Sequence, residues 1–229
     1  IILVTGPTGS GKSTTLKATL EHIKDGKRKI ITVEDPVEYN IPGVTQVQTK
    51  ADIGYTFARA LRSILRQDPD VIMIGEIRDL ETAQIAVQAS LTGHMVFSTI
   101  HTNDAAGAFA RLTDMGVEPF LVASSLAGVL AQRLVRRLCP HCKAPYDPTD
   151  EELADVNMSR ERLHGQQLYK AVGCDLCQQV GYKGRLGIYE CLPAWEEIKQ
   201  LILTQADSGQ VKRKGVELGM RTLAEDGMY

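Results

Sequence analysis

The sequence predicts an α/β fold built on a parallel β-sheet, with a small metal-bound insertion and helices near the C-terminal end. Three observations carry this prediction. Short apolar runs alternate with helical patterns, a glycine-rich loop joins the first strand to the first helix, and two Cys-x-x-Cys pairs lie farther along. Strands that alternate with helices form a parallel sheet covered on both faces. With 229 residues, the chain has room for one core and an appendage.

The expected strands are 1–5, 29–33, 70–75 and 95–100, with a short ribbon at 44–48. The expected helices are a first one that ends near residue 24, then 55–66, 80–91, 104–115 and 119–138, followed by 194–205 and 208–218. The segment 119–138 is almost entirely apolar, so we expect a buried helix there. We therefore divide the chain into a core (1–138), a cysteine-rich subdomain (139–191) and a C-terminal helical segment (192–229) that is cut short.

Composition excludes several classes of protein. Apolar residues make up 43% and charged residues 24%, and 26 Lys and Arg against 28 Asp and Glu leave a net charge of −2. This balance is typical of a globular chain and argues against a protein that coats nucleic acid. The longest weakly polar stretch, 120–131, is about half of the roughly 20 residues that span a bilayer. The start, Ile1 to Thr5, has no initiator Met and no basic segment, so we expect a fragment and no signal peptide.

The glycine-rich loop matches the phosphate-binding pattern GxxxxGK[ST]. It consists of Gly6, Pro7, Thr8, Gly9, Ser10, Gly11, Lys12, Ser13 and Thr14. The glycines let backbone N–H groups turn toward a phosphate, Lys12 adds a positive charge, and Ser13 offers a hydroxyl to Mg²⁺. A chance match in a turn is the alternative, but the position between a strand and a helix favours a phosphate site.

Such a site needs a carboxylate near Mg²⁺ and a group that orients water. Glu76 ends the strand at 70–75, where Asp is more usual, and its longer side chain could reach Mg²⁺ through a water. Glu34, Asp35 and Glu38 follow the second strand at the same rim of a parallel sheet, and any of them could orient water. The alternative is that Asp35 only caps a turn and that one Glu is a solvated charge.

His94 and His101 bracket the strand at 95–100, which we expect to end near the phosphates. Either histidine could sense a γ-phosphate, or both could be structural. An arginine supplied by another subunit often assists phosphoryl transfer. The candidates are Arg59, Arg62 and Arg66 on one helical face, and Arg78 just beyond Glu76. A solvated helical face is the alternative.

Cys139, Cys142, Cys174 and Cys177 form two CxxC pairs separated by 31 residues. Two such pairs complete a tetrahedral site for Zn²⁺ with no open position, so we expect a structural metal. A redox CxxC is the rival, but one pair would suffice for that role. This use of cysteine indicates a reducing compartment such as the cytosol. His141 and Cys191 are left over, and we interpret both as structural.

These motifs resemble those of the secretion-superfamily ATPases that power type II secretion and type IV pilus assembly, and they are most similar to the GspE family. The matching boxes are 6–16, 33–38, 67–79 and 91–102, together with the paired CxxC motifs. The resemblance covers nearly the whole chain. It implies a RecA-like P-loop ATPase core with a Cys₄ zinc-binding insertion, and the cofactors ATP, Mg²⁺ and Zn²⁺.

The resemblance also implies roles for individual residues. Lys12 binds phosphate, Ser13 and Glu76 serve Mg²⁺, and Glu38 activates water, with Glu34 as the second choice. His94 and His101 occupy the histidine box. The arginines that match those thought to meet the nucleotide of a neighbouring subunit are Arg62, Arg66, Arg78 and Arg185.

By resemblance, the expected function is ATP hydrolysis that powers pseudopilus assembly for protein export across the outer membrane. The family forms cytoplasmic homohexamers on the inner membrane, docked on secretion-platform proteins mostly through domains that we expect to be missing here. A type IV pilus extension ATPase is the nearest alternative, since retraction members lack the Cys quartet. A nucleic-acid translocase gains little support from the −2 charge and 5% aromatic residues, so we expect no nucleic-acid partner. A zinc-bound interaction module is a third interpretation.

Overall fold

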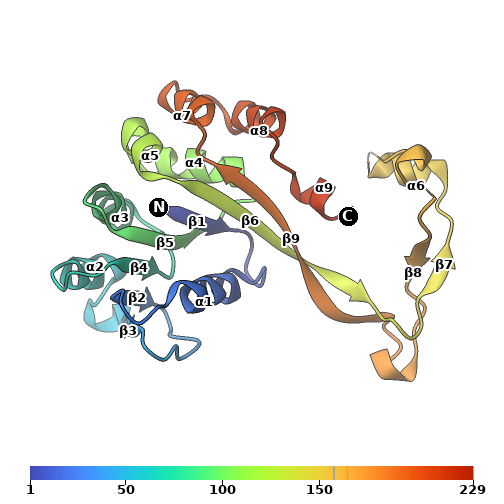
Figure 1. Ribbon diagram of the computed structural model, residues 1–229, viewed down its shortest axis with the longest axis horizontal. Coiled ribbons are helices and arrows are strands. Elements are labelled where there is room, and N and C mark those ends of the chain that lie inside the picture. Colours follow the sequence, from blue (N-terminus) through green and yellow to red (C-terminus); the bar gives the residue numbers. More distant parts are fainter. Residues whose placement is uncertain (157, 164, 229) are drawn as a thin grey trace. The chain divides into compact units, whose positions relative to one another are not determined.

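A seven-stranded sheet with the order β3-β2-β4-β5-β1-β6-β9 organises the fold (Figure 1). The computed structural model describes residues 1–156, 158–163 and 165–228. The strands of this sheet are β1 (Ile2–Thr5), β2 (Ile30–Glu34), β3 (Thr45–Gln48), β4 (Val71–Ile74), β5 (Met95–Ile100), β6 (Gly128–Leu138) and β9 (Tyr182–Pro193). The pairs β2/β3, β2/β4, β4/β5, β1/β5 and β1/β6 are all parallel, as the sequence predicts.

Alternating side chains of the strands enter two separate hydrophobic clusters. Leu3 of β1 and Ile72 of β4 belong to the larger cluster, whereas their neighbours Val4 and Val71 belong to the smaller one. Successive residues of a strand face opposite sides of the sheet. The larger cluster is completed by α2 (Phe57–Leu65), α3 (Leu80–Leu91), α4 (Ala105–Asp114) and α5 (Pro119–Ser125), and the smaller one by α1 (Lys12–Ile23). Both faces are therefore covered, which confirms the predicted architecture.

The predicted helix at 119–138 is wrong beyond Ser125. Proline at the first position starts α5, Leu126 is already extended, and β6 follows from Gly128. Residues 128–131 pair in parallel with β1, Ile2 opposite Gly128 and Thr5 opposite Ala131. A short apolar run fits a buried helix or a buried strand equally well by periodicity. Here the open edge of β1 decides, because pairing satisfies its backbone groups.

The chain divides into two compact units, residues 1–133 with 189–227, and residues 134–188. In the first unit, α7 (Glu196–Leu203) packs on α5 and α8 (Ser208–Glu217) packs on α4, and α9 (Leu223–Asp226) follows. In the second, β7 (Ala144–Tyr146) pairs antiparallel with β8 (Leu168–Lys170), and α6 (Asp150–Asp155) lies between them in the sequence. Short 3₁₀ turns occupy 51–53, 160–163 and 175–177. Across the described ranges, no helix has the length and apolar character that crossing a membrane requires.

Candidate functional site

The glycine-rich loop between β1 and α1 presents backbone N–H groups at the start of a helix. Gly6, Gly9 and Gly11 have φ angles of 143°, 77° and 91°, a region that favours glycine. Gly11 is the N-cap of α1, and within the described residues no side chain caps that first turn. The first N–H groups of a helix lack intrahelical partners and carry the positive end of its dipole. The loop is therefore suited to bind an anion such as a phosphate.

Lys12 lies at this loop with its ammonium group on main-chain oxygens. The Nζ atom donates to the carbonyl oxygens of Gly6 at 2.9 Å and Pro7 at 3.1 Å. Burial lowers the pKa of Lys12, and the negative charge of Glu76 acts in the opposite direction. The ammonium is thus poorly solvated and lies in the field of a nearby carboxylate, and phosphate oxygens could replace the two carbonyls as its acceptors.

Glu76 joins two other charged or titratable side chains at the carboxyl end of β4. Its Oε2 lies 2.6 Å from Nε of Arg78, and its Oε1 lies 3.0 Å from Nε2 of His101. The backbone fixes this arrangement, because the Ile77 N–H donates to the Thr99 carbonyl oxygen at 3.0 Å. The side chain of Glu76 is 16% exposed, whereas that of His101 is 46% exposed. The strands β4 and β5 thereby bring Glu76 and His101 together, near Lys12.

His94 lies at the other edge of the sheet. It precedes β5, and its Nδ1 atom lies 2.9 Å from the carbonyl oxygen of Ala89 and 3.2 Å from Oγ1 of Thr92. His101 follows the same strand, and seven residues of strand span about 23 Å. Because Thr5 at the end of β1 pairs with Ile100 at the end of β5, the glycine-rich loop lies at the same end of the strands as His101. Of the two candidate phosphate sensors, only His101 therefore lies beside this chain's phosphate loop, and His94 does not.

The two candidate glutamates, Glu34 at the end of β2 and Glu38 beyond it, differ in their surroundings. Oε1 of Glu34 accepts hydrogen bonds from Oγ1 of Thr32 at 2.6 Å and from Nε2 of Gln46 at 2.9 Å. Glu38 is exposed and has no hydrogen bond or ion pair with any residue in the described part of the chain. Glu34 follows Val33, which pairs with Ile74 of β4, so it lies at the same sheet edge as Glu76. Only Glu34 is thus held in place by its neighbours.

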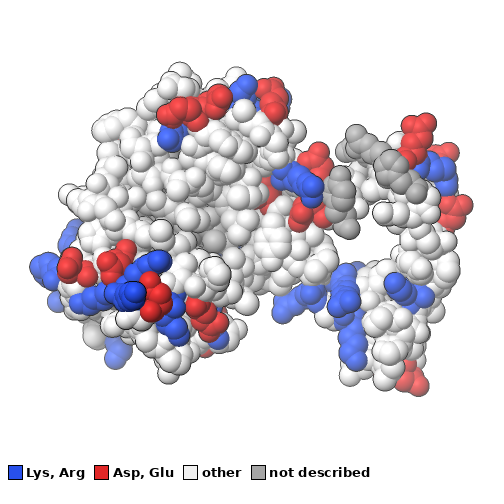
Figure 2. Space-filling model, in the orientation of Figure 1, with Lys and Arg blue, Asp and Glu red and all other residues white. Residues whose placement is uncertain are grey.

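The candidate arginines do not gather at one place. Arg78 contacts Glu76, while Arg62 of α2 forms an ion pair with Glu81 of α3. Arg66 is the exposed C-cap residue of α2. The helix α2 belongs to the hydrophobic cluster opposite that of α1, and acidic and basic side chains are interspersed over this part of the surface (Figure 2). Arg185 is exposed and belongs to the unit 134–188.

Sequence reasoning missed two polar groups that support the loop. Gln132 of β6 is buried, and its Oε1 accepts a hydrogen bond from Oγ1 of Thr15 at 2.7 Å. A Cβ on Gly6 would lie 2.3 Å from the carbonyl oxygen of Gln132. The Thr5 hydroxyl lies 2.8 Å from the Ile100 carbonyl oxygen and accepts from the Thr102 N–H at 2.9 Å. The sequence could not predict the contact of Gln132 with Thr15, because it depends on β6 being a strand next to β1.

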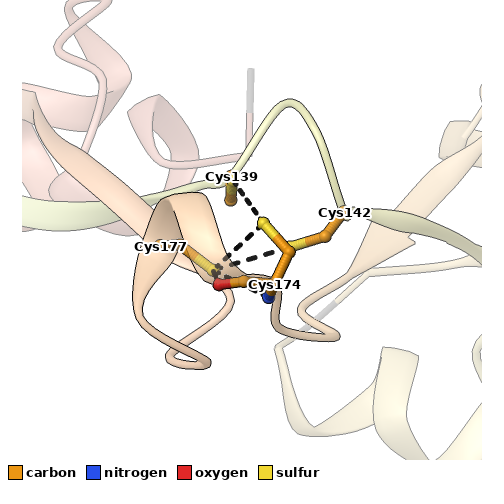
Figure 3. A group of neighbouring side chains, drawn as sticks. All are labelled: Cys139, Cys142, Cys174 and Cys177. Atoms are coloured by element: carbon orange, nitrogen blue, oxygen red, sulfur yellow. Dashed lines mark hydrogen bonds between the residues drawn. The ribbon is translucent and has the colours of Figure 1, made fainter.

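The four cysteines of the two CxxC motifs converge in the unit 134–188 (Figure 3). All four Sγ atoms of Cys139, Cys142, Cys174 and Cys177 lie within 4.8 Å of one another. Three of the separations are 3.7, 3.8 and 3.9 Å. A tetrahedral zinc with Zn–S bonds of 2.3 Å requires sulfur atoms about 3.8 Å apart. The cluster therefore fits a metal ion of this kind.

Backbone N–H groups surround the sulfur atoms of this cluster. The N–H groups of Cys174 and Gly181 each lie 3.2 Å from Sγ of Cys177. Burial is the largest single influence and opposes ionisation of Cys177, but the hydrogen bonds from these two N–H groups and from the side chains of Cys174 and Cys142 together lower the pKa of the thiol to about 6. Thiolates are the form that binds metals. Cys191 belongs to the other unit and does not join the cluster.

Sequence comparison with known proteins identifies one family. The profile of the family described as "Type II/IV secretion system protein" matches residues 1–229. The type IV pilus assembly ATPase PilB of Myxococcus xanthus is 52% identical over 229 residues, which are 100% of this chain and 40% of PilB. The type II secretion system ATPase E of Vibrio cholerae is 55% identical over 230 residues, 100% of this chain and 45% of that protein. The chain thus spans less than half the length of these relatives.

Solved structures of ATPases share the fold of this chain. The ATPase DotB of Legionella pneumophila has a TM-score of 0.67 at 25% identity, over 98% of this chain and 54% of that one. The pilus retraction motor PilT with bound ADP has a TM-score of 0.61 at 30% identity, over 98% of this chain and 59% of PilT. Together with the parallel sheet and the phosphate loop, these matches confirm the predicted P-loop ATPase fold. The chain belongs to the type II/IV secretion system protein family.

Proposed function

We propose that this chain is the ATP-hydrolysing part of a type II secretion motor that powers pseudopilus assembly for export of proteins across the outer membrane. One observation carries the proposal. The glycine-rich loop with Lys12 and the pair Glu76–His101 meet at the carboxyl edge of one parallel sheet. The identity of 55% with the type II secretion system ATPase E of Vibrio cholerae supports the choice of motor.

The chemistry follows from the positions of these groups. The N–H groups of the loop and Lys12 would hold the phosphates of ATP. Ser13, exposed in the first turn of α1, and Glu76 offer the oxygen ligands that Mg²⁺ prefers. When bound, Mg²⁺ would neutralise charge on the phosphates. Glu38 would take the proton of the attacking water, with Glu34 as the alternative, and His101 would act beside Glu76.

We further propose that the site is completed by a neighbouring subunit in a homohexamer. Arg62 and Arg66 lie on a helix that packs against the sheet face opposite α1, so they are available to a second chain rather than to their own loop. Arg185 would act from the unit 134–188, and Arg78 from its place beside Glu76. An arginine supplied in this way is worth about 10³ to 10⁵ in rate. The hexamer would work at the cytoplasmic face of the inner membrane, on platform proteins of the secretion system.

The cysteine cluster would hold one structural Zn²⁺ through Cys139, Cys142, Cys174 and Cys177. Four thiolate ligands leave no open coordination position, so the metal would contribute folding energy and no chemistry. We accordingly propose the division of the chain into a core (1–138), a zinc-binding subdomain (139–191) and a C-terminal helical segment (192–229).

A type IV pilus assembly motor is the second candidate. The observation that favours it is the 52% identity with two PilB proteins over the whole of this chain. The longer protein that carries this chain would distinguish the candidates in a deletion strain. Restored export of secreted proteins supports the first proposal, whereas restored surface pili without export replaces it with the second.

ATP turnover tests the enzymatic part directly. Phosphate release per chain is measured against protein concentration, for the chain alone and for a fusion to a hexamer-forming protein. Lys12→Ala is the blank, and Lys17→Ala on the same helix is the matched control. A Lys12-dependent rate that rises with concentration or fusion supports a site completed between subunits. A flat rate contradicts arginines acting in trans, and a rate that Lys12→Ala leaves unchanged contradicts the ATPase.

A further inference from the structure

A fully buried carboxylate lies at the junction of β9, α4 and α9. Glu190 of β9 has 0% of its surface exposed. Its Oε1 accepts a hydrogen bond from the Ala105 N–H at 2.9 Å, and its Oε2 accepts one from the Leu223 N–H at 3.3 Å. A buried carboxylate is costly unless it is hydrogen-bonded or paired. Glu190 therefore joins the first residue of α4 to the first residue of α9.

Lys212 of α8 connects the same carboxylate to the loop after β5. Its Nζ lies 3.9 Å from Oε2 of Glu190 and 3.2 Å from Oδ2 of Asp104. Asp104 caps α4, because its Oδ1 accepts from the Gly107 N–H at 2.9 Å. One ammonium group thus faces two carboxylates, one on β9 and one at the end of the loop 101–104. The C-terminal helices are tied to this loop by charge as well as by packing.

The loop 101–104 is the segment that carries His101. Oγ1 of Thr102 donates to the Asp104 carbonyl oxygen at 2.8 Å and lies 2.7 Å from Oγ1 of Thr5, the residue before the glycine-rich loop. At the other end, Nε2 of His101 lies 3.0 Å from Glu76. Ion pairs and hydrogen bonds thus connect α8 and β9 to Asp104, and Asp104 through Thr102 to Thr5, while the backbone of 101–104 joins these contacts to His101 at the phosphate edge of the sheet.

We propose that Glu190 and Lys212 are positioning residues for His101, through which the C-terminal helices α8 and α9 set the geometry of the nucleotide site. This proposal rests on the proposed function. Its physical basis is that the other contacts of the loop, from Thr5 to Thr102 and from the Arg133 guanidinium to the Asn103 carbonyl oxygen at 3.1 Å, do not hold its Asp104 end. The contacts of Asp104 and Ala105 with Lys212 and Glu190 fix its second end, and with it the direction of the His101 ring. Movement of α8 or α9 would then reach the site through two side chains.

Two readouts test the proposal. The first needs no activity: the ring resonances of His101, assigned with His101→Gln, are compared by NMR between the wild-type chain and Glu190→Gln. The change removes the negative charge and keeps the size of the side chain. We expect a shift of the His101 resonances while those of His94 at the opposite edge stay in place. Lys212→Met is the second variant, and it carries the test if Glu190→Gln does not fold. His101 resonances that do not move overturn the proposal.

The second readout is turnover. We expect Glu190→Gln and Lys212→Met to lower kcat roughly ten- to a hundredfold with little change in KM for ATP, the size of effect that misplaced catalytic groups produce. In the double variant with His101→Gln, kcat should equal that of His101→Gln alone, because residues that act through one another are not additive. Lys214→Met, which removes an exposed ion pair with Glu217 on the same helix, is the matched control.

The outcomes separate this proposal from the proposed function. If the wild-type chain shows no Lys12-dependent turnover, either alone or fused to the hexamer-forming protein, the proposed ATPase activity is contradicted. The NMR comparison still decides the role of Glu190. A wild-type chain that turns over ATP, with additive losses in the double variants, contradicts the positioning role alone. Equal losses in Lys214→Met and Lys212→Met would also overturn it, because the effect would then come from α8 in general.

Discussion

Glu34 ends β2 and Glu38 follows it, yet only one of them is free to change hydrogen-bond partners. Glu34 holds two hydrogen bonds, from Thr32 and Gln46, whereas Glu38 is exposed. We expect Glu38→Gln to lower ATP turnover about 10² to 10⁴-fold, the range for loss of a general base, with an unchanged Tm. Glu34→Gln, the matched control, keeps an acceptor for both donors and should lose less. Phosphate release decides between them, and a larger loss in Glu34→Gln would exchange the two assignments.

The buried ammonium of Lys12 gives a pH dependence with a definite sign. Burial lowers its pKa below the ordinary 10.5. The protonated form therefore carries a free-energy penalty in the folded state, which is fully present below the folded pKa and vanishes above 10.5. The free energy of unfolding of the wild type relative to Lys12→Met should thus rise as the pH rises toward 10.5. Urea unfolding of both variants between pH 7 and pH 10 measures this difference, and a constant difference contradicts it.

Side chains within a local motif could be predicted from the sequence, whereas those that tertiary pairing supplies could not. Glu76 comes two residues after β4 and Lys12 lies at the end of the loop that follows β1, so the strand pattern and the loop motif were enough to bring them to one edge. His101 follows its strand and His94 precedes it, so a parallel sheet alone brings His101 to the phosphate edge and leaves His94 at the opposite end. Glu190 carries no local signal, since its partners are 85 residues before it and 33 residues after it.

At the scale of elements, β6 marks the limit of the sequence prediction. Helices α1 to α4 and strands β1 to β5 match the predicted order because each has its own periodicity and its own punctuation by Gly, Pro or capping residues. The apolar segment after Pro119 has no such signal, and β6 forms because 128–131 pair with β1 and its other neighbour in the sheet is β9. That error hid Gln132 beneath the glycine-rich loop.

The contact between β6 and the loop makes a prediction about two glycines. A Cβ on Gly6 would lie 2.3 Å from the Gln132 carbonyl oxygen, whereas a Cβ on Gly9 meets nothing within 4 Å. Both have positive φ, so either alanine costs about 1–2 kcal/mol of backbone strain. We expect Gly6→Ala to lower Tm further and to abolish nucleotide binding, because β6 or the loop must move. Calorimetry with titration of ADP measures both, and equal losses in the two variants would show that strain alone decides.

At the scale of the whole molecule, two units with different sources of stability share one chain. Residues 1–133 and 189–227 contain both hydrophobic clusters. The unit 134–188 exposes several large apolar side chains: Val135, Val156, Tyr169, Val172, Leu176, Val180 and Leu186. A small unit with so little buried apolar surface usually depends on a metal or on disulfides, and its four clustered cysteines are unpaired.

Removal of zinc should therefore unfold the unit 134–188 and leave the other unit folded. We expect a chelator, or Cys177→Ser, to release about one zinc ion per chain and to make residues 134–188 susceptible to protease, because the binding energy of a structural metal is folding energy. Residues 1–133 and 189–227 should remain protease-resistant and keep Lys12-dependent binding of ADP, since their core needs no metal.

Cys191→Ser, which changes a cysteine outside the cluster, is the matched control and should keep its zinc. Metal analysis with limited proteolysis measures both effects. Loss of ADP binding on chelation would mean that the first unit also depends on the metal, and protease resistance of 134–188 without zinc would mean that the cysteine cluster is not what holds this unit together.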